Sequence, residues 1–374
     1  MTQRGLVLVT GGAGFIGSHT ARALLERGWR VRALDRLRAP VHEPGVRPAW
    51  LPDEVELVVA DVRDREAVAR ALRGADHVLH LAAYQDYLPD FSTFYRVNAV
   101  GTALLYELIV AEKLPVERIV LAATQAEYGE GKHRCAEHGV LYPPPRGEAQ
   151  LAARDWEVRC PSCRRPLEAL PTDEAVVNPS STYAMSKRAA EELALTLGRR
   201  YGIPTAAMRY SIVQGPGQSF RNAYSGALRA FTVQALHGRR PLVYEDGEQI
   251  RDFVWIGDVV AANLLMLTRP QIESGSYNVG GDRRVRVIEL ARLVVQAVGL
   301  SGEPEVPGIY RVGDTRHIRS DVGRLRGLGW APTGEQREMV RSYVAWASQQ
   351  PDLYDSSADA LARMRQLGVL REAR

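Results

Sequence analysis

The sequence is short of cysteine, of long apolar runs and of net charge. Three cysteines in 374 residues are too few for a disulfide framework, and no apolar run reaches the roughly eighteen residues that a membrane-spanning helix needs. The chain passes from Met1–Arg4 directly into a strand-like run, without an apolar leader segment. These absences predict a cytoplasmic protein with reduced thiols and no membrane partner. The net charge of +4 does not favour nucleic acid as a partner.

What the chain does have is the composition of an ordinary globular protein. Apolar residues make up 45% and charged residues 25%, and the length suits one large α/β unit or two closely joined domains. Strand-like runs alternate with helical patterns through the first third of the chain, which predicts a parallel sheet covered on both faces. The expected strands are Leu6–Thr10, Arg30–Leu34, Val55–Val59, His77–Leu81 and Arg118–Ala122.

A glycine-rich turn joins the first expected strand to a helical pattern in the stretch "LVLVTGGAGFIGSHTARALLERG". Glycines at such a turn let the backbone approach a pyrophosphate, and the helix N-terminus presents free N–H groups to it. A glycine triplet alone is weak evidence, but its place between a strand and a helix predicts a dinucleotide site. The residues expected to contact the cofactor here are Gly11, Gly14, Phe15, Ile16 and Gly17.

Asp35 ends the second expected strand, about 20 residues after the glycines. A carboxylate at this position accepts hydrogen bonds from the adenosine ribose, which favours NAD. Arg36 and Arg38 lie nearby and would suit the 2′-phosphate of NADP instead. NAD is the preferred cofactor because the carboxylate repels that phosphate.

Two further segments are expected along the cofactor groove. Asp61 and Val62 follow a strand and are predicted to lie beside the adenine. The segment "HLAA" supplies Leu81, Ala82 and Ala83 to the groove. For His80, in the same segment, a buried packing role and a direct cofactor contact are both open.

Tyr183 and Lys187 lie four residues apart, on one face of an expected helix. A lysine beside a tyrosine lowers the pKa of the phenol, so the tyrosine acts as a base near neutral pH. Thr124 follows the strand Arg118–Ala122, where its hydroxyl reaches Tyr183 and the reacting oxygen of the substrate. Such a pair also arises by chance on surface helices, but the dinucleotide motif before it favours a catalytic role.

These motifs resemble those of extended short-chain dehydrogenase/reductases, in the nucleotide-sugar epimerase and dehydratase group. The resemblance runs from Leu6 to about Ser348 and includes "TGGAGFIGS" (10–18), "DVRD" (61–64), "HLAA" (80–83), "VNAVGT" (97–102), "RDFVWIGDV" (251–259) and "YNVGG" (277–281). It implies a Rossmann-type doubly wound sheet with a smaller C-terminal substrate lobe, NAD as cofactor and a UDP- or dTDP-hexose as substrate. It also implies a homodimer formed through the helices around Thr93–Glu112 and Tyr183–Tyr201.

The resemblance also implies roles for single residues. Asn98 helps to position the segment under the active site. Arg251 and a later arginine, most plausibly Arg316 in "GDTRH", bind the substrate diphosphate, for which arginine has a matching bidentate geometry. For both arginines, a plain salt bridge is the alternative interpretation.

The residues after Thr124 distinguish between the reactions of this group. Resemblance to the 4,6-dehydratases would require an Asp-Glu pair there, and the decarboxylases carry glutamate at the second position, but this chain has Gln125 and Ala126. Glu127 is one residue further along the chain, and this displacement should point its side chain away from the active site. Epimerisation at C4 is therefore the predicted reaction. A dehydrogenase or 4-ketoreductase that releases its cofactor, and a non-catalytic NAD-binding scaffold, are the alternatives.

One departure from the family concerns the substrate phosphates. Where relatives often carry asparagine, this chain has Ile212, which cannot make the same hydrogen bond. Gln218, Arg221 and Asn222 are expected to replace it. Tyr84 and Gln125 complete the expected substrate contacts.

All three cysteines lie in an insertion of about fifty residues between Gly129 and Tyr183. Cys135-x-x-His138 and Cys160-x-x-Cys163 form a zinc-ribbon-like ligand set, and four protein ligands predict a structural ion rather than a catalytic one. Reduced thiols with a chance histidine are the alternative. The insertion resembles that of dTDP-L-rhamnose 4-epimerase-like members of the group, and we expect it to border the sugar pocket.

The predicted organisation has four parts. They are a dinucleotide-binding domain over 1–130 and 175–210, an inserted zinc-binding flap over 131–174, a lobe over 211–350 that mostly binds substrate, and a polar tail over 351–374 whose function is unreadable.

Overall fold

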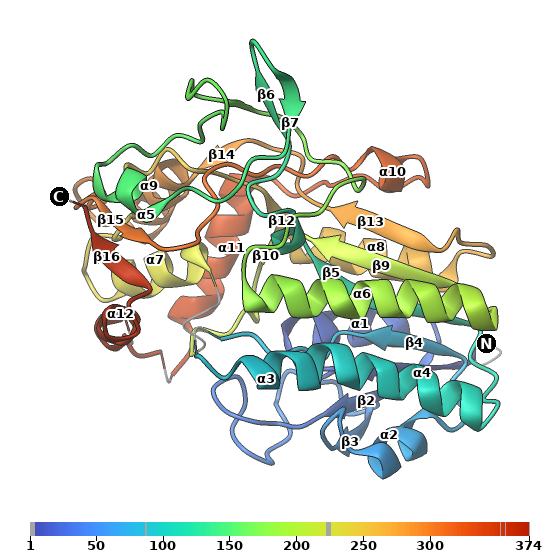
Figure 1. The fold of residues 1–374 in the computed structure, drawn as a ribbon. Helices are drawn as coiled ribbons and strands as arrows, with labels where there is room; N and C mark the ends of the chain where they lie inside the picture. Colours follow the sequence, from blue (N-terminus) through green and yellow to red (C-terminus); the bar gives the residue numbers. More distant parts are fainter. Residues whose placement is uncertain (1–3, 87, 222–225, 352, 356, 374) are drawn as a thin grey trace.

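A seven-stranded parallel sheet forms the centre of the molecule (Figure 1). The computed structural model describes residues 4–86, 88–221, 226–351, 353–355 and 357–373. The strands follow the order β13-β9-β5-β4-β1-β2-β3, so the direction of winding reverses between β1 and β4. Their bounds are β1 (Leu6–Thr10), β2 (Arg30–Asp35), β3 (Glu56–Val59), β4 (His77–His80), β5 (Arg118–Thr124), β9 (Thr205–Tyr210) and β13 (Gly275–Val279). This order confirms the expected doubly wound sheet.

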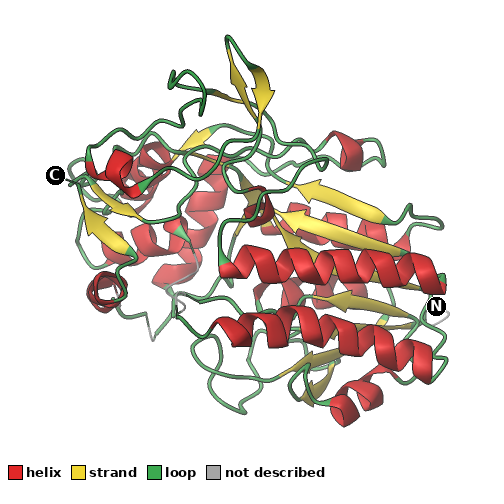
Figure 2. Ribbon diagram, in the orientation of Figure 1, coloured by secondary structure: helices red, strands yellow, loops and turns green. Residues whose placement is uncertain are grey.

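Helices cover both faces of the sheet (Figure 2). Along β1, Val7 and Val9 join one apolar core, whereas Leu6 and Leu8 join the other, because successive side chains point to opposite faces. Because both faces of this strand are buried, Leu6–Val9 form a continuous apolar run rather than an alternation of apolar and polar residues. The first core lies under α1 (Phe15–Leu25) and α8 (Ile256–Thr268), and the second under α2 (Arg65–Leu72), α4 (Gly101–Ala111) and α6 (Thr182–Tyr201).

The helix expected over Thr93–Glu112 is present but irregular. It begins as α3 (Phe91–Phe94), widens into the π-helical turn η1 (Tyr95–Val100) and continues as α4. A π-turn shifts the register of the side chains that follow it and is common at functional sites. Here the turn contains Asn98, whose contacts are described below.

A second lobe is built around a separate apolar core. Its helices α7 (Ala227–Leu236), α9 (Val287–Val298) and α11 (Gln336–Ser348) bury residues such as Phe231, Leu290 and Tyr343 against one another. Short strand pairs join this lobe to the sheet. The remaining elements are β10 (Ile212–Gln214), β11 (Ile250–Arg251), β12 (Phe253–Trp255), β14 (Val285–Arg286), β15 (Ile309–Arg311) and α10 (Gly323–Arg326). The lobe expected over 211–350 is not continuous, because α8 and β13 return to the sheet.

Part of the insertion projects at the top of Figure 1. Before it, β5 ends in the 3₁₀ turn η2 (Gln125–Tyr128). The insertion consists of β6 (His133–Cys135), β7 (Gly139–Leu141), α5 (Glu148–Ala152) and β8 (Glu168–Ala169). Its three strands form an antiparallel sheet in the order β7-β6-β8. The buried apolar residues of this unit are few: Cys135, Val158, Cys160 and Leu167 form one small cluster, and Leu151 is buried on α5.

The polar tail folds back onto the second lobe. Its helix α12 (Ser357–Gln366) is followed by β16 (Leu370–Glu372), which pairs antiparallel with β15. Met364 and Leu370 pack against Ile309 in a small apolar cluster. The tail is therefore a structural part of the lobe. Among the described helices, none is both long and apolar enough to cross a membrane.

Candidate active site and cofactor cleft

A cavity of about 630 Å³ opens at the carboxyl ends of the strands. This is the side of a doubly wound sheet on which ligands bind, at the point where the strand order reverses. One end of the cavity is lined by the start of α1, the middle by residues after β4 and β5, and the far end by α7 and α12. Five residues predicted along the cofactor groove line it, namely Gly14, Phe15, Ile16, Leu81 and Ala83, and so do Tyr183 and Lys187, which are expected to contact both cofactor and substrate.

The glycine-rich turn has no room for side chains. A Cβ on Gly17 would lie 2.3 Å from the carbonyl oxygen of Gly11, and one on Gly11 would lie 2.9 Å from the amide nitrogen of Ala82. Gly11 also has a φ of +66°, which other residues rarely adopt. The turn therefore brings bare backbone to the N-terminus of α1, as a pyrophosphate site requires.

Asp35 lies at the end of β2 beside this turn and is 9% exposed. Its carboxylate accepts hydrogen bonds from the backbone N–H groups of Ala13 (3.2 Å) and Leu37 (3.0 Å). Two backbone bonds fix the carboxylate and leave it further lone pairs for the hydroxyls of a ribose. The position agrees with that expected for an NAD-binding acid.

Asp61 and Val62 follow β3, and their side chains have different surroundings. Arg63 makes a bidentate ion pair with Asp61, with both nitrogen–oxygen distances 2.8 Å. Burial acts to raise the pKa of Asp61, but the hydrogen bonds and charge of Arg63 hold it below its usual range. The side chain of Val62 packs into the core under α4, so only its backbone is available to a ligand.

The Tyr183/Lys187 pair lies on the first turns of α6, and both residues line the cavity. Ser181 caps the helix by accepting the N–H of Ala184, which fixes the start of the helix in front of the cavity. Lys187 is 3% exposed, and burial lowers its pKa to about 8, while the carboxylates of Glu127 and Glu191 oppose that fall.

Thr124 ends β5 and faces the same cavity. Its Oγ1 accepts the N–H of Ala126 at 3.2 Å, and its own N–H donates to Glu127 at 3.3 Å. Because the Oγ1 serves as an acceptor in this cap, its hydrogen is left to donate into the cavity. All three predicted catalytic residues therefore line the same cavity.

Asn98 and His80 act behind the cavity. Asn98 accepts the N–H of Tyr84 (2.7 Å) and donates to the Oγ of Ser186 (2.9 Å), so it ties the loop after β4 to α6 between the two catalytic residues. His80 bonds to the hydroxyls of Thr10 and Thr102, and burial lowers its pKa to about 3. For His80 the packing interpretation is the one that the structure supports. Ala82 donates its N–H to Thr10 and supports the glycine-rich turn.

The structure separates the two arginines that were expected to bind diphosphate. Arg251 lines the cavity. Arg316 lies outside the cavity lining and is 0% exposed, because Glu157, Glu245 and Asp246 bind its guanidinium. The prediction that Arg316 binds the substrate diphosphate is therefore wrong. Arg311, five residues earlier, lines the cavity instead. Arg311 ends β15 and Arg316 follows the next turn, and the sequence offered no signal to distinguish them.

The remaining predicted substrate residues are divided between the cavity and its surroundings. Gln125 lines the cavity and donates to the hydroxyls of Ser211 (3.1 Å) and Ser320 (2.9 Å), and Gln218 also lines it. Tyr84 and Arg221 lie outside the lining; the hydroxyl of Tyr84 donates to Asp90, and the guanidinium of Arg221 lies over the ring of Phe220. Asn222 falls outside the described residues.

Sequence reasoning missed two groups of lining residues. Arg229, on α7, is a buried cavity residue with a charge that suits phosphate. The tail contributes Ser357, Ala360, Leu361 and Met364 from α12. The apolar residues of α12 are spaced three apart at Leu361 and Met364, and this spacing was the available signal for a buried helical face.

The four predicted metal ligands come together in the insertion. Their ligand atoms all lie within 4.8 Å of one another. Cys135 Sγ lies 3.6 Å from Cys163 Sγ, and His138 Nδ1 lies 3.5 Å from the Sγ atoms of Cys135 and Cys160. A tetrahedral zinc site places sulfur atoms about 3.8 Å apart and nitrogen about 3.5 Å from sulfur. The sulfur atoms are too far apart for a disulfide, for which the S–S bond is about 2 Å.

The sequence is similar to those of known epimerases and matches one protein family over most of its length. The model of the NAD dependent epimerase/dehydratase family matches residues 7–148 and 161–280. The chain belongs to the NAD dependent epimerase/dehydratase family. Within this family, dTDP-L-rhamnose 4-epimerase from Burkholderia thailandensis is 34% identical over 92% of this chain and 96% of its own length. A putative UDP-glucose 4-epimerase from Methanocaldococcus jannaschii is 30% identical over 91% of this chain and 98% of its own.

Solved epimerase structures share the fold of this family member. UDP-glucose 4-epimerase from Thermus thermophilus, in complex with NAD, matches with a TM-score of 0.70 and 30% identity over 91% of this chain and 98% of the other. The enzyme of the same name from Thermotoga maritima, with UDP-glucose, matches with a TM-score of 0.72 and 27% identity over 91% and 98%. These likenesses confirm the Rossmann-type assignment. The family match is interrupted at residues 149–160, which lie in the insertion.

Proposed function

We propose that this protein is an NAD-dependent epimerase that inverts C4 of a nucleotide-diphosphate sugar. The observation that carries the proposal is the meeting of Thr124, Tyr183 and Lys187 on one cavity next to the glycine-rich turn. The names of the relatives support it, since both curated proteins cited above are called 4-epimerases.

The residues of the cleft fit NAD. The turn at Gly11–Gly17 and the N-terminus of α1 would hold the pyrophosphate, Asp35 the adenosine ribose, and Lys187 the nicotinamide ribose. When bound, NAD would supply the acceptor for the hydride of the sugar carbon and the source of the hydride that restores it on the opposite face. The Thermus thermophilus epimerase was solved in complex with NAD, which supports this choice of cofactor.

Residues of the chain itself remove and return the proton of the C4 hydroxyl. Tyr183 takes the proton of the C4 hydroxyl as a base, with the ammonium of Lys187 stabilising the phenolate that does so. Thr124 donates its hydroxyl hydrogen toward the same oxygen and holds it in place. Return of the proton from Tyr183 completes the inversion after the sugar has turned in the cavity. A cavity of about 630 Å³ offers space for that rotation.

An elimination of water across C5–C6 lacks the acid and base that it needs. Gln125 and Ala126 occupy the two positions after Thr124, and both line the cavity. The next carboxylate along the chain, Glu127, is 0% exposed and lies outside the lining. Its Oε1 accepts the N–H of Thr124, and Arg209 lies 3.8 Å from its other oxygen. The residues therefore favour epimerisation over dehydration.

The charge of the cavity suits a nucleotide diphosphate. Among the described residues, four basic side chains line it: Lys187, Arg229, Arg251 and Arg311. Arginine binds phosphate oxygens bidentately, so the three arginines of the lining can hold both phosphates. A UDP- or dTDP-hexose is therefore the proposed substrate class. The Thermotoga maritima epimerase was solved with UDP-glucose, which supports this class.

A panel of UDP-, dTDP- and GDP-hexoses tests the proposed function. The NAD-loaded protein should convert one or more of them into the C4-inverted sugar, seen by NMR, while the absorbance at 340 nm stays constant. A net change at 340 nm with turnover would instead show a dehydrogenase or ketoreductase that releases its cofactor. Binding of NAD without conversion of any sugar nucleotide would show a scaffold.

We also propose that Cys135, His138, Cys160 and Cys163 hold a structural zinc ion. Support comes from the match between their separations and tetrahedral coordination, and from the scarcity of other buried apolar residues in the insertion. Four protein ligands close the coordination sphere, so no position is left for substrate. Metal analysis of purified protein should give close to one zinc per chain. Less than half an equivalent would contradict the site.

A homodimer is the proposed assembly. Large apolar side chains are exposed on the outer face of α3, η1 and α6: Phe91, Tyr95, Val100 and Met185, which are 40–59% exposed. Figure 1 shows α3, α4 and α6 side by side on one face of the molecule. Pairing this face with its copy would bury these residues from water. Light scattering should find twice the chain mass of 41.4 kDa; a single 41.4 kDa species would contradict the dimer.

The proposed location is the cytoplasm, where thiol ligands for zinc stay reduced. The three cysteines are free rather than bridged. Fractionation of the native cells, followed by detection with an antibody, tests this location.

A further inference from the structure

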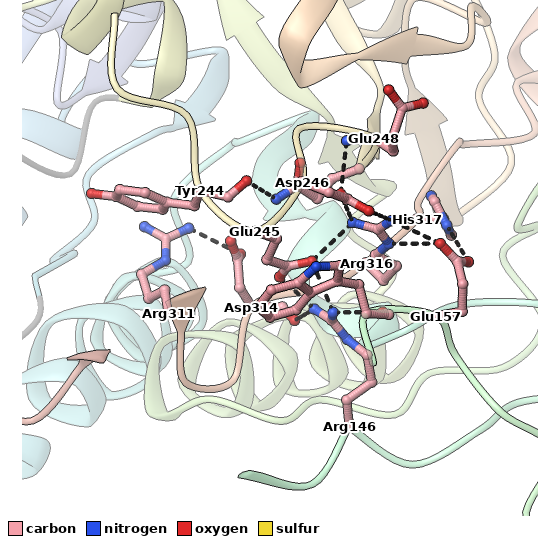
Figure 3. Close-up of polar contacts among 12 residues, drawn as sticks. Arg146, Glu157, Tyr244, Glu245, Asp246, Glu248, Arg311, Asp314, Arg316 and His317 are labelled. Atoms are coloured by element: carbon pink, nitrogen blue, oxygen red, sulfur yellow. Dashed lines mark hydrogen bonds and ion pairs between the residues drawn. The ribbon is translucent and has the colours of Figure 1, made fainter. Parts of the chain in front are cut away.

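A buried cluster of ion pairs joins the insertion to the second lobe (Figure 3). Arg146, from the insertion, is at its centre, and its side chain is 2% exposed. It makes a bidentate pair with Glu245 of the lobe, with both distances 3.0 Å. Its other donors go to Glu130 (3.4 Å) and to the backbone carbonyls of Trp156 (2.8 Å) and Asp314 (2.8 Å). Every donor of this guanidinium therefore has an acceptor.

Glu157, also from the insertion, makes the second connection. One oxygen accepts from Arg316 at 2.7 Å, and the other lies 3.0 Å from His317 Nε2. His317 Nδ1 accepts the N–H of Ile250, so Nε2 carries the hydrogen and donates it to Glu157. The hydrogen bond from His317 and the charge of Arg316 lower the pKa of Glu157 to about 2, so the carboxylate is ionised at neutral pH.

Both connections lead to the arginines of the cavity. Arg251 donates to the carbonyl of Arg316 at 3.0 Å, so the residue held by Glu157 fixes one side of Arg251. The carboxylate of Asp314 lies 3.3 Å from Arg251 and 2.9 Å from Arg311. Asp314 is itself held through its carbonyl by Arg146. Arg146 and Glu157 thus bind the segment Arg311–His317 at separate points, the first at Asp314 and the second at Arg316 and His317.

Arg316 has more negative partners than it needs for neutralisation. Asp246 binds it bidentately at 2.7 and 2.8 Å, and Glu245 adds a contact of 2.9 Å. Both of these acids belong to the lobe. Glu157 is a third carboxylate on the same guanidinium, and its side chain is 41% exposed. Its contribution is therefore to the position of the segment rather than to the charge balance of the buried arginine.

We propose that Arg146 and Glu157 are positioning residues for substrate binding, through which the insertion holds Arg251 and Arg311 in the geometry that receives the diphosphate. This rests on the proposed function, because it takes these two arginines as the diphosphate ligands. The insertion is then part of the substrate site although neither of its two residues lines the cavity. Glu157 lies in the stretch 149–160 that the family model does not match, whereas Arg146 lies just inside the matched residues 7–148.

The test compares Glu157→Gln and Arg146→Gln with the unaltered, NAD-loaded protein. Titration calorimetry with UDP and with dTDP measures diphosphate affinity, and the KM and kcat of the sugar nucleotide identified by the panel are measured in parallel. Each variant should raise the Kd and the KM roughly 3- to 30-fold, while kcat and NAD content change less than about twofold. Glu157→Asp, which keeps the charge, should recover part of the affinity.

Matched controls come from the same insertion. Arg134 and Glu168 form a surface ion pair between β6 and β8, are 56% and 65% exposed, and pair with each other inside the insertion's own sheet. Arg134→Gln and Glu168→Gln should leave Kd, KM and kcat unchanged. Should Arg146→Gln fail to fold, the half-exposed Glu157→Gln still decides the question.

The outcomes separate this proposal from the proposed function. Lower melting temperature with unchanged Kd and KM in Glu157→Gln would show a purely structural connection and overturn the positioning role, while the proposed function stands. Equal losses in the control variants would also overturn it. If the unaltered protein binds neither UDP nor dTDP, the proposed function fails and this proposal fails with it.

Discussion

The parallel sheet and the insertion are stabilised by different kinds of interaction. Every residue of β1 is buried, and its side chains enter two large apolar cores. The apolar cluster around the cysteines of the insertion has only four buried members, two of which are cysteines, and the insertion is joined to the second lobe by the ion pairs of Arg146 and Glu157. The sheet is therefore expected to fold through apolar burial alone, whereas the insertion depends on an ion and on charge pairing.

This difference separates chemistry from substrate binding. The sheet and α6 carry Thr124, Tyr183 and Lys187, and the insertion controls the arginines at the other end of the cavity. Damage to the first region should lower kcat, and damage to the second should raise KM.

The largest effect is expected from Tyr183→Phe, which removes the proposed base and leaves the sheet intact. The rate of C4 inversion should fall by roughly 10²- to 10⁴-fold, with NAD content and melting temperature unchanged. Tyr201→Phe is the matched control, because Tyr201 ends the same helix and is 45% exposed. A Tyr183→Phe variant that keeps more than about a tenth of the activity would place the chemistry elsewhere.

Cys160→Ser tests the other region, the insertion, by removing one of the proposed zinc ligands. Cys160 is 0% exposed and supplies one of the four ligands. Zinc content should fall to below half an equivalent, proteases should cut within residues 131–174, and the KM should rise as in the Glu157 variant. NAD content should stay the same, because the sheet does not depend on the ion. Ser162→Ala, between the two cysteines, is the control, and loss of NAD from Cys160→Ser would contradict the separation of the regions.

Leu361→Ala tests the wall of the cavity formed by the tail. Loss of its apolar contact should cost about 1 kcal/mol of binding free energy, or roughly fivefold in KM, with kcat unchanged. Arg363→Ala, on the exposed side of α12, should have no effect. Equal KM values for Leu361→Ala and the unaltered protein would remove the tail from the substrate site.

The smallest effect concerns stability and pH. Burial, reinforced by Glu191, raises the pKa of Glu127 to about 8, whereas an unfolded chain has the ordinary value near 4.5. The folded protein therefore binds the extra proton between these values, and its unfolding free energy falls as pH rises from 5.5 to 7.5. In Glu127→Gln this fall should be smaller by about 1–2 kcal/mol, measured by urea unfolding at both pH values.

Glu117→Gln is the control for that experiment, because the Glu117 side chain is 65% exposed. Parallel pH profiles for Glu127→Gln and the unaltered protein would show that Glu127 is not protonated in the folded state.

The sequence predicted the sheet and the catalytic residues because each depends on a local pattern. The strand Leu6–Thr10 has the bounds that were expected, and Tyr183 and Lys187 needed only the 3.6-residue period of a helix to lie together. The four metal ligands were also readable, since each pair is close in sequence. Features that depend on side-chain partners far away in the chain were not readable.

The diphosphate arginine expected after Arg251 shows this limit. Arg311 and Arg316 are five residues apart, and only the acids Glu157, Glu245 and Asp246 decide which of them is buried. Those acids are 70 or more residues distant in sequence. The tail was unreadable for the same reason, because β16 pairs with β15 through backbone bonds that carry no sequence signature.

The most direct test of the central claim uses a sugar nucleotide from the panel that carries deuterium at C4. The account predicts a C4-inverted product that keeps the deuterium, with no net change in absorbance at 340 nm, because the same hydrogen is removed and returned within one active site. Inversion with loss of the deuterium to water, or accumulation of reduced cofactor in step with product, would contradict it.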